Sequence, residues 1–284
     1  MSPVLSIVIA NYNYGVFLED ALRSVFRQGV DGIELIVVDG GSTDDSVEII
    51  RKYADKIAWW CSEPDNGQTD AFIKGFSHAH GKYLIWLNAD DMFVDGALKR
   101  FMKAAGRHPE CEWFVGGCIH ANEKMEVVRC TRARPFSQYE ADHGQICVYS
   151  PSSFFARSLY NRVGGMDPFF HYSMDTDLWC KFYYQQHIRY RVMPGYLFAF
   201  RIHGGSKTMC VNAEKMGNGG DKNIAAVRPD YDRGRIEHEM IRSAMPPCPP
   251  MSNVMRLLRT NWWLHFRSLI DTLRWRGHRV NEAV

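Results

Sequence analysis

The chain has 284 residues, of which 46% are hydrophobic, 13% aromatic and 23% charged, and its formal net charge is +2. These totals are typical of a soluble globular protein with one large α/β domain, or a domain plus an appendage. A run of about 18 apolar residues is absent, which excludes a membrane-spanning helix. Residues 252–284 hold six arginines and two acidic residues, so the net positive charge belongs to the C-terminal tail.

The eight cysteines are scattered along the chain, with no CxxC pair and no Cys/His cluster at zinc-finger spacing. This pattern is typical of free thiols in a reducing compartment rather than of a disulfide framework or a structural zinc site. The N-terminus also lacks the basic-then-apolar layout of a signal peptide. We therefore expect a cytoplasmic protein.

Short apolar runs alternate with helical patterns across the first 110 residues. The runs predict buried parallel strands at 4–10, 34–39, 57–61 and 83–88. Between them the sequence predicts helices over 16–28, from Ser42 or Thr43 through Ile50, and over 69–79. Four strand–helix alternations indicate a doubly wound, mostly parallel sheet.

The pattern weakens after residue 110. It predicts antiparallel strands over 112–129, helices over 153–163 and 174–186, and two strands at 189–193 and 196–202. A glycine-rich stretch and the proline-rich segment 246–250 follow, and they predict a flexible loop and linker over 209–251. The last predicted element is a long helix over 254–276. The expected divisions are therefore 1–110, 111–208, 209–251 and 252–284.

Four polar clusters follow the predicted parallel strands, at 11–13, 39–45, 63–70 and 88–91. Any one of them can be an ordinary turn between a strand and a helix. Ligands of open α/β sheets, however, bind outside the carboxyl ends of the strands. Because all four clusters would lie at that edge, we expect a ligand site there.

The last cluster contains two adjacent carboxylates, Asp90 and Asp91, directly after a buried strand. Adjacent carboxylates on a turn suit a hard divalent cation that also binds phosphate oxygens, as Mg²⁺ and Mn²⁺ do. The sequence contains no GxxxxGK[ST] loop, and the turn after the first strand is NYNYG rather than GxGxxG. We therefore expect a nucleotide phosphate to be held through a metal ion.

Five motifs resemble one known family, and they occur in its order and at its spacing: SIVIANYN, IVVDGGSTDDS, NGQTDAFIKGFSHAHGKYLIWLNADD, VGGMDPFFHYSMDTDLW and RIHGGSKT. Over residues 3–208 the chain resembles a family-2 inverting glycosyltransferase of the GT-A fold. The resemblance implies a GT-A-type sheet with a small antiparallel acceptor-side region, to which a C-terminal helix is attached. Residues 1–110 would bind the donor, and 111–208 would bind the acceptor and carry catalysis.

On the donor side, the resemblance implies that Ala10, Tyr12, Asp39 and Gln68 bind the nucleotide. Tyr12 would lie against the base, and Asp39 would accept a hydrogen bond from a uracil-type N–H. Asp90 would bind ribose or an outer-sphere water.

The resemblance also assigns the metal and the chemistry. Asp91 would be the direct metal ligand, and His203 would complete the metal and diphosphate site. Asp175 would be the catalytic base, with Asp177 and Trp179 shaping the acceptor side.

Three positions depart from the family pattern. Gly40 stands where many relatives have a second acidic residue, which bears on the contact with the base. Met174 stands where a Glu often precedes the base, and Ile73 where an Asn is common. The groups that the chemistry requires are retained.

The same chemistry follows from the residues alone. Displacement at an anomeric carbon needs a carboxylate to take the acceptor's proton and a cation to neutralise the departing diphosphate. Asp175 can equally be a helix N-terminal residue, and His203 an ordinary core or surface histidine. Asp177 lies two residues from Asp175 and cannot share its helical face, so we expect only one of them to be the base.

The tail pattern places Val254, Leu258, Trp262, Leu269 and Leu273 on one helical face with arginines beside or opposite. Tryptophans and arginines on an amphipathic helix suit a membrane interface with anionic lipid. The alternative is packing on the catalytic domain or on another subunit. Nucleic acid is not an expected partner, because the rest of the chain is mildly acidic.

The sequence thus predicts a metal-dependent enzyme at the inner face of the cell membrane. It would move a sugar from a nucleoside diphosphate, expected to be UDP, to a saccharide or lipid-linked saccharide in surface polysaccharide synthesis. Two alternatives stay open, a sugar nucleotidyltransferase and a non-catalytic sugar-nucleotide binder. NYNYG lacks the basic glycine-rich loop that the former usually needs.

Overall fold

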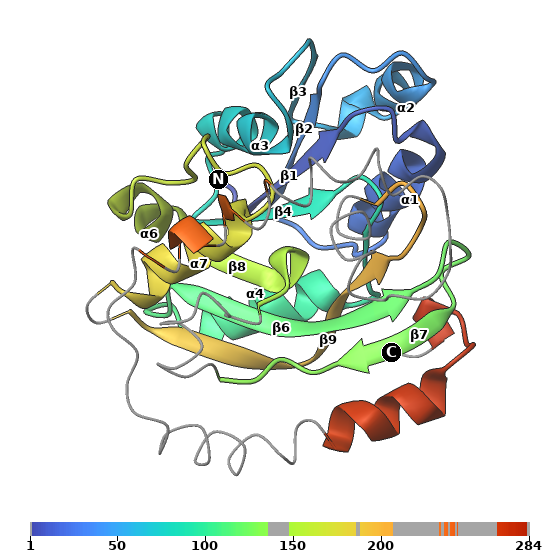
Figure 1. The fold of residues 1–284 in the computed structure, drawn as a ribbon, viewed down its shortest axis with the longest axis vertical. Coiled ribbons are helices and arrows are strands. Elements are labelled where there is room, and N and C mark those ends of the chain that lie inside the picture. Colours follow the sequence, from blue (N-terminus) through green and yellow to red (C-terminus); the bar gives the residue numbers. More distant parts are fainter. Residues whose placement is uncertain are drawn as a thin grey trace.

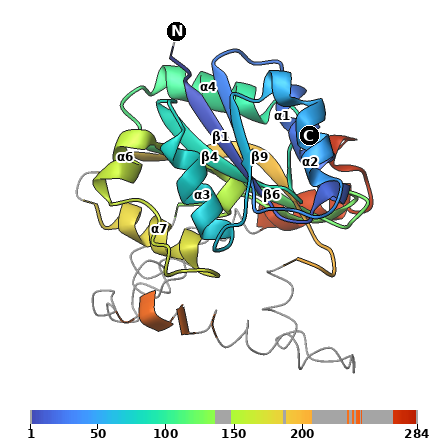
Figure 2. The ribbon, with the colours of Figure 1, turned by 90° about the horizontal axis from the view of Figure 1, so that it is seen from above.

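The computed structural model describes residues 2–135, 148–185, 188–206, seven single residues between 233 and 243, and 266–282. These residues form a nine-stranded sheet with helices on both faces (Figures 1 and 2). The sheet order is β3-β2-β1-β4-β8-β6-β9-β5, and β7 pairs with β6 outside this path.

The first half of the sheet is parallel, as the sequence predicts. Its strands are β1 (Leu5–Asn11), β2 (Ile33–Asp39), β3 (Trp59–Ser62) and β4 (Tyr83–Asn88). They alternate with α1 (Gly15–Phe26), α2 (Ser46–Lys52), the short 3₁₀ helix η1 (Ala54–Lys56) and α3 (Gln68–Ser77). Apolar runs such as LSIVI become parallel strands because helices cover both of their faces.

The second half of the sheet contains both parallel and antiparallel strand pairs. It comprises β5 (Met92–Phe93), α4 (Ala97–Arg107), β6 (Trp113–Ala121), β7 (Val127–Thr131), η2 (Ser150–Ser152), β8 (Ser153–Ala156), α6 (Arg157–Arg162), α7 (Met174–Tyr183), β9 (Tyr190–Arg201) and η3 (Val280–Glu282). β8 runs antiparallel between β4 and β6, and β9 is parallel to β6 and antiparallel to β5. The antiparallel strands predicted over 112–129 are confirmed as β6 and β7.

Two predicted elements are wrong in part. The helix predicted over 153–163 begins only at Arg157, because Ser153–Ala156 are fully buried between two strands and pair with both. The two strands predicted at 189–193 and 196–202 are one strand, β9, whose register against β6 shifts near Pro194 and Gly195. Proline cannot donate a ladder hydrogen bond, so its place at an irregularity is expected.

Helices cover the two faces of the sheet in separate groups. In Figure 2, α1, α2 and α4 lie on one side of the strands, and α3, α6 and α7 on the other. The Gln28 side chain after α1 donates to the Val94 carbonyl and accepts from the Leu98 amide, which joins α1 to the start of α4. On the opposite face, Trp179 of α7 stacks on Trp86 and Trp113, with ring centroids 5.2 and 5.5 Å away.

The C-terminal helix, residues 266–275, lies against β7 (Figure 1). Ser268 and Thr272 accept hydrogen bonds from the amides of Arg132 and Cys130, and Asp271 pairs with the Arg132 guanidinium at 2.6 Å. The rest of the helix predicted over 254–276 lies outside the described residues, as does the linker 246–250. Within the part of the chain that the structure describes, no helix is long and apolar enough to cross a membrane.

Two residues of the stretch expected to be a flexible loop and linker are buried in the structure. Glu237 is 1% exposed and Ile241 is 3% exposed. The remainder of 209–251 lies outside the described residues, apart from single positions between 233 and 243.

Candidate functional site

The predicted polar clusters meet at one edge of the sheet. Strand register places Asn11 beside Asp39 and Ala10 beside Asn88, and Asp39 beside Ser62, which precedes the 63–70 cluster. All of these residues lie at the carboxyl ends of parallel strands. The structure therefore brings the polar clusters together at the edge where open α/β sheets bind ligands.

Asp39 is fully buried at this edge and is surrounded by protein donors. One carboxylate oxygen accepts from Asn11 and from the Ser42 hydroxyl, and the other accepts from the Ser62 hydroxyl and the Gly41 and Ser42 amides. Burial raises the pKa of Asp39, but these hydrogen bonds outweigh it and hold the pKa below its usual range. A contact with a nucleotide base requires one of these donors to give way.

Two other residues near Asp39 bear on the base site. Tyr12 is 59% exposed at the edge, which leaves its ring open to a stacking partner. Asp65 lies beside Gly40, and a Cβ at Gly40 would come within 2.9 Å of the Asp65 Oδ2. The Asp65 carboxylate thus occupies the space that a side chain at position 40 would need. Burial and the negative charge of Asp70 raise the pKa of Asp65.

Asp90 and His203 face each other across this edge. The His203 Nε2 lies 3.0 Å from the Asp90 Oδ2, although the two residues are far apart in sequence. The rings of Tyr14 and Phe17 pack against the imidazole, and the Tyr14 hydroxyl donates to the Gly205 carbonyl at 2.8 Å. A hollow lined by the β6–β7 turn (residues 122–126) and residues 202–204 opens beside His203.

Asp91 has a different environment. It is fully buried, and its two oxygens accept from the Asn88 side chain at 2.9 Å and from the Arg201 amide at 3.0 Å. Gln68 in turn donates to Asn88 at 2.9 Å. Burial and the adjacent Asp90 raise the pKa of Asp91 well above its usual range. Asp90, in contrast, is only partly buried and lies adjacent to His203, so it is the carboxylate of the pair that a ligand at this edge can reach.

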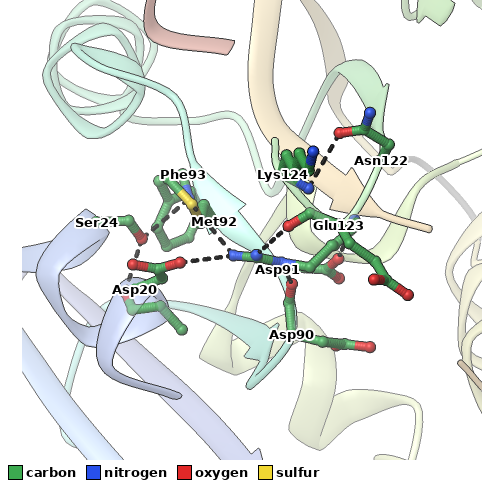
Figure 3. A network of polar contacts seen from close by, with 11 residues as sticks. Asp20, Ser24, Asp90, Asp91, Met92, Phe93, Asn122, Glu123 and Lys124 are labelled. Carbon is green, nitrogen blue, oxygen red and sulfur yellow. Dashed lines mark hydrogen bonds and ion pairs between the residues drawn. The ribbon is translucent and has the colours of Figure 1, made fainter. Parts of the chain in front are cut away.

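Arg201 is a site residue that the sequence analysis missed. Three residues that it contacts, Asp20, Asp90 and Glu123, are labelled in Figure 3. The buried Arg201 guanidinium donates to the backbone carbonyls of Asp90 and Glu123 and pairs with Asp20 at 2.9 Å. The same group lies over the Phe17 ring at 4.7 Å. Arg201 therefore supplies the positive charge beneath the two adjacent carboxylates. The sequence offered one signal for Arg201, which is that it lies two residues before His203, at the end of a buried strand.

Asp90 and His203 are the residues at this edge that could hold a divalent ion shared with a ligand. Among the described residues, no three His, Cys, Asp or Glu side chains are grouped to hold a metal ion. Asp90 and His203 offer one oxygen and one nitrogen close together, and Mg²⁺ is commonly held by one or two carboxylates plus substrate phosphates and water.

Asp175 lies in the first turn of α7. One of its oxygens accepts from the Ser150 hydroxyl at 2.8 Å, and the other from the Thr176 amide at 2.7 Å. Burial raises its pKa above the usual range, although these hydrogen bonds oppose the shift. A carboxylate with a raised pKa is a stronger base, which suits proton abstraction.

The structure places the two predicted acceptor-side residues, Asp177 and Trp179, in the interior. Trp179 is 1% exposed and belongs to the aromatic core described above. Asp177 is also buried and forms an ion pair with Lys181 at 2.7 Å, one helical turn later. Of the acidic pair on this helix, Asp175 is therefore the one left to act as a base.

Comparison with known proteins identifies this arrangement. The sequence model of the family described as Glycosyl transferase family 2 matches residues 6–162, more than half of the chain. The chain belongs to this family. It is therefore a glycosyltransferase, and the two alternative functions weighed from the sequence are set aside.

Curated relatives of this glycosyltransferase include mycobacterial proteins. An uncharacterized glycosyltransferase of Mycobacterium tuberculosis is 32% identical over 180 residues, which is 62% of this chain and 67% of that protein. A PGL/p-HBAD biosynthesis glycosyltransferase of the same species is 26% identical over 221 residues, which is 75% of this chain and 82% of that protein.

Solved structures share the fold of the glycosyltransferase. Staphylococcus aureus TarS 1–349 in complex with UDP-GlcNAc has a TM-score of 0.57 at 16% identity, over 100% of this chain and 84% of that chain. The mannosyltransferase PcManGT from Pyrobaculum calidifontis, in complex with GDP-Man and Mn²⁺, has a TM-score of 0.56 at 17% identity, over 94% and 81% of the two chains. The GT-A fold expected from the sequence is thereby confirmed.

Proposed function

We propose that this glycosyltransferase moves a sugar from a nucleoside diphosphate donor, a UDP-sugar, to a hydroxyl of a saccharide acceptor with inversion at the anomeric carbon. One observation carries the proposal. Two neighbouring residues in the first turn of α3 reach both halves of the site: Gln68 donates to Asn88, and Thr69 contacts the Met174 sulfur beside Asp175. The donor edge and the base are thus adjacent.

The donor would lie along the carboxyl edge of the parallel strands. Tyr12 would stack on the base, Ala10 and Gln68 would line its path, and Asp39 would hold the surrounding turns. The UDP-GlcNAc and GDP-Man bound by the two structural neighbours support a sugar nucleotide as donor. They differ in the base, so the choice of uridine is tested below.

We assign a divalent metal to Asp90 and His203, with Asp91 fixing the turn beneath them. When bound, such an ion neutralises the negative charge of the departing diphosphate. Asp91 maintains this geometry because both of its oxygens are occupied by donors from Asn88 and Arg201. The Mn²⁺ bound with GDP-Man by PcManGT supports the use of a divalent metal.

Asp175 would act as the base. The acceptor oxygen attacks the anomeric carbon, its proton passes to the Asp175 carboxylate, and the bond between that carbon and the diphosphate oxygen breaks. Because the attack comes from the face opposite the leaving group, the configuration inverts. General base assistance is typically worth about 10²–10⁴-fold in rate.

We propose a lipid-linked acceptor at an anionic membrane surface. The outer face of the C-terminal helix presents Leu269, Ile270 and Leu273, which are 54%, 42% and 70% exposed. Arginines flank this face, a combination that suits the interface of an anionic bilayer. The relative named for PGL/p-HBAD biosynthesis supports a membrane-associated acceptor.

A donor panel tests the proposed function. Purified protein is titrated with UDP-, GDP-, dTDP- and ADP-sugars, with Mn²⁺, Mg²⁺ or a chelator present, and donor binding and nucleoside diphosphate release are measured. We expect a response to a UDP-sugar that the chelator removes and that Asp90→Asn and His203→Ala abolish. A response confined to another nucleotide would overturn the uridine assignment, and full activity with the chelator would overturn the metal.

A further inference from the structure

A buried carboxylate outside the site contacts the loop that leads into α7. Glu237 accepts hydrogen bonds from three consecutive backbone amides, those of His171, Tyr172 and Ser173, at 2.7 to 3.0 Å. Its side chain is almost completely buried, and its only charged contact among the described residues is the half-exposed Arg233 at 3.2 Å. Such charge-assisted bonds to amides are among the strong hydrogen bonds in proteins.

The same loop is held from its other side by the donor half. The Thr69 hydroxyl donates to the Phe170 carbonyl at 2.6 Å. His171 lies so close to Gly67 that a Cβ there would come within 2.3 Å of its ring. The loop is therefore enclosed between the start of α3 and Glu237, and it ends two residues before Asp175.

We propose that Glu237 is a positioning residue for Asp175. Glu237 accepts hydrogen bonds from the three loop amides. It thereby holds residues 171–173 against α3 and fixes where α7 begins. This inference rests on the proposed role of Asp175 as the base. A positioning role for Glu237 would also make the segment around it part of the catalytic half rather than a linker.

Backbone amides that are removed from water need a hydrogen-bond acceptor. Glu237 provides the acceptor for the amides of the last three residues before α7, and the Ser173 side chain makes no capping hydrogen bond at the start of the helix. A buried amide that loses its acceptor is destabilising, and the loop can avoid this only by moving toward water. A shift of about 1 Å in a catalytic group can cost roughly 10²-fold in rate.

The test compares Glu237→Ala, Glu237→Gln and Glu237→Asp with Glu239→Gln, a change of an exposed glutamate on the same segment. We expect kcat to fall about 10- to 100-fold in Glu237→Ala, less in Glu237→Gln, and least in Glu237→Asp, which keeps the charge. UDP affinity and donor KM should stay within about twofold of the wild-type values. Glu239→Gln should behave as wild type.

Amide hydrogen exchange supplies a readout that does not depend on turnover. Exchange at 171–173 should accelerate in Glu237→Ala, while exchange in β1 and β4 stays unchanged. The proposal is overturned if kcat is unchanged, if UDP binding falls in parallel with kcat, or if exchange at 171–173 is unaltered. Failure of the proposed function looks different, because the wild-type protein would then transfer no sugar from any donor.

Discussion

Four aspartates at this site have different chemistry because each meets different donors. Asp39 and Asp91 are fully buried and have both oxygens occupied by protein groups, so they maintain the turns at the strand ends. Asp90 is partly open and faces His203, and Asp175 is held by a serine hydroxyl and a backbone amide at the start of a helix. Residue type alone does not separate these roles, whereas burial and hydrogen-bond partners do.

Asp175→Asn should remove turnover and leave the donor site intact. Asparagine has nearly the same shape but cannot take the acceptor's proton, so we expect kcat to fall by about 10²–10⁴-fold. Calorimetric titration with UDP should give an unchanged dissociation constant. If the variant kept more than a tenth of wild-type kcat, the proton would have to leave by another route.

The pH dependence of kcat should follow the titration of Asp175. The base works only when deprotonated, so kcat should fall as the pH drops through the raised pKa of Asp175, above the usual aspartate range. Ser150→Ala removes a hydrogen bond that lowers this pKa. The acidic limb of the profile should therefore move to higher pH in Ser150→Ala but not in Ser77→Ala, a change on the exposed side of α3. A shift in the opposite direction would contradict the hydrogen-bond argument.

Arg201 should matter to stability as much as to the site. Arg201→Met leaves the buried carbonyls of Asp90 and Glu123 without donors, at about 1–3 kcal/mol each. We expect the free energy of unfolding, measured by urea denaturation, to fall by about 3 kcal/mol or more. Arg27→Met is the matched control, because its ion pair with Asp95 is exposed and long at 3.6 Å. That variant should stay within about 0.5 kcal/mol of wild type.

At the scale of elements, the helices and strands of the parallel half follow from sequence because each buried run ends in a polar turn. The glycine of α3 shows how tightly these layers pack. A Cβ at Gly75 would lie 2.3 Å from a methyl group of Val8 in β1, whereas Gly106 at the end of α4 has no neighbour within 4 Å of its added Cβ.

This contrast predicts opposite effects of the same substitution. Gly75→Ala should lower the free energy of unfolding by about 1–3 kcal/mol, because the helix must move away from β1. Gly106→Ala should raise it by about 0.5–1 kcal/mol, since alanine loses less backbone entropy in a helix. Thermal unfolding of the two variants checks both signs. Equal melting temperatures would show that α3 can shift without cost.

The elements that escaped prediction are those fixed by partners distant in sequence. β5 has only two residues and exists because Met92 and Phe93 pair with β9. β8 is a strand because β4 and β6 enclose it, although its apolar residues run directly into the helical pattern of α6. Among the candidate site residues, the strand-end clusters were predictable because parallel strands end at one edge, and the role of Asp175 as the base stays a prediction. The contacts of Arg201 and Glu237 were not predictable, because each depends on three-dimensional neighbours that no local pattern records.

At the scale of the whole molecule, the C-terminal helix has one face against the domain and another face exposed to solvent. Thr272 bonds to Cys130 of β7, and Ser268 and Asp271 bond to Arg132 just after that strand. Asp271 also accepts from the Tyr196 hydroxyl. The opposite face, at the spacing i, i+1 and i+4, presents Leu269, Ile270 and Leu273 to solvent. The alternatives weighed from sequence, docking on the domain and contact with a membrane, are therefore compatible. Each uses its own face.

Vesicle binding can test the outer face without disturbing the inner one. Replacing Leu269, Ile270 and Leu273 together by glutamine should weaken partitioning onto phosphatidylserine vesicles more than tenfold, because each leucine or isoleucine contributes about 1.5–3 kcal/mol when fully buried. Substitution is preferable to deletion of the tail, which would also expose β7. UDP affinity and melting temperature should match the wild-type values, since all three side chains are exposed.

The positive charge of the same helix can be tested separately in the same vesicle-binding experiment. Binding of the wild-type protein should weaken with added salt and on phosphatidylcholine vesicles, because each basic residue near an anionic surface is worth about 1 kcal/mol. Arg274→Gln should reduce that salt dependence. If the triple glutamine variant bound phosphatidylserine vesicles as tightly as wild type, the helix would not be the membrane contact. If it instead converted a wild-type dimer to a monomer in sedimentation, the outer face would belong to a subunit interface.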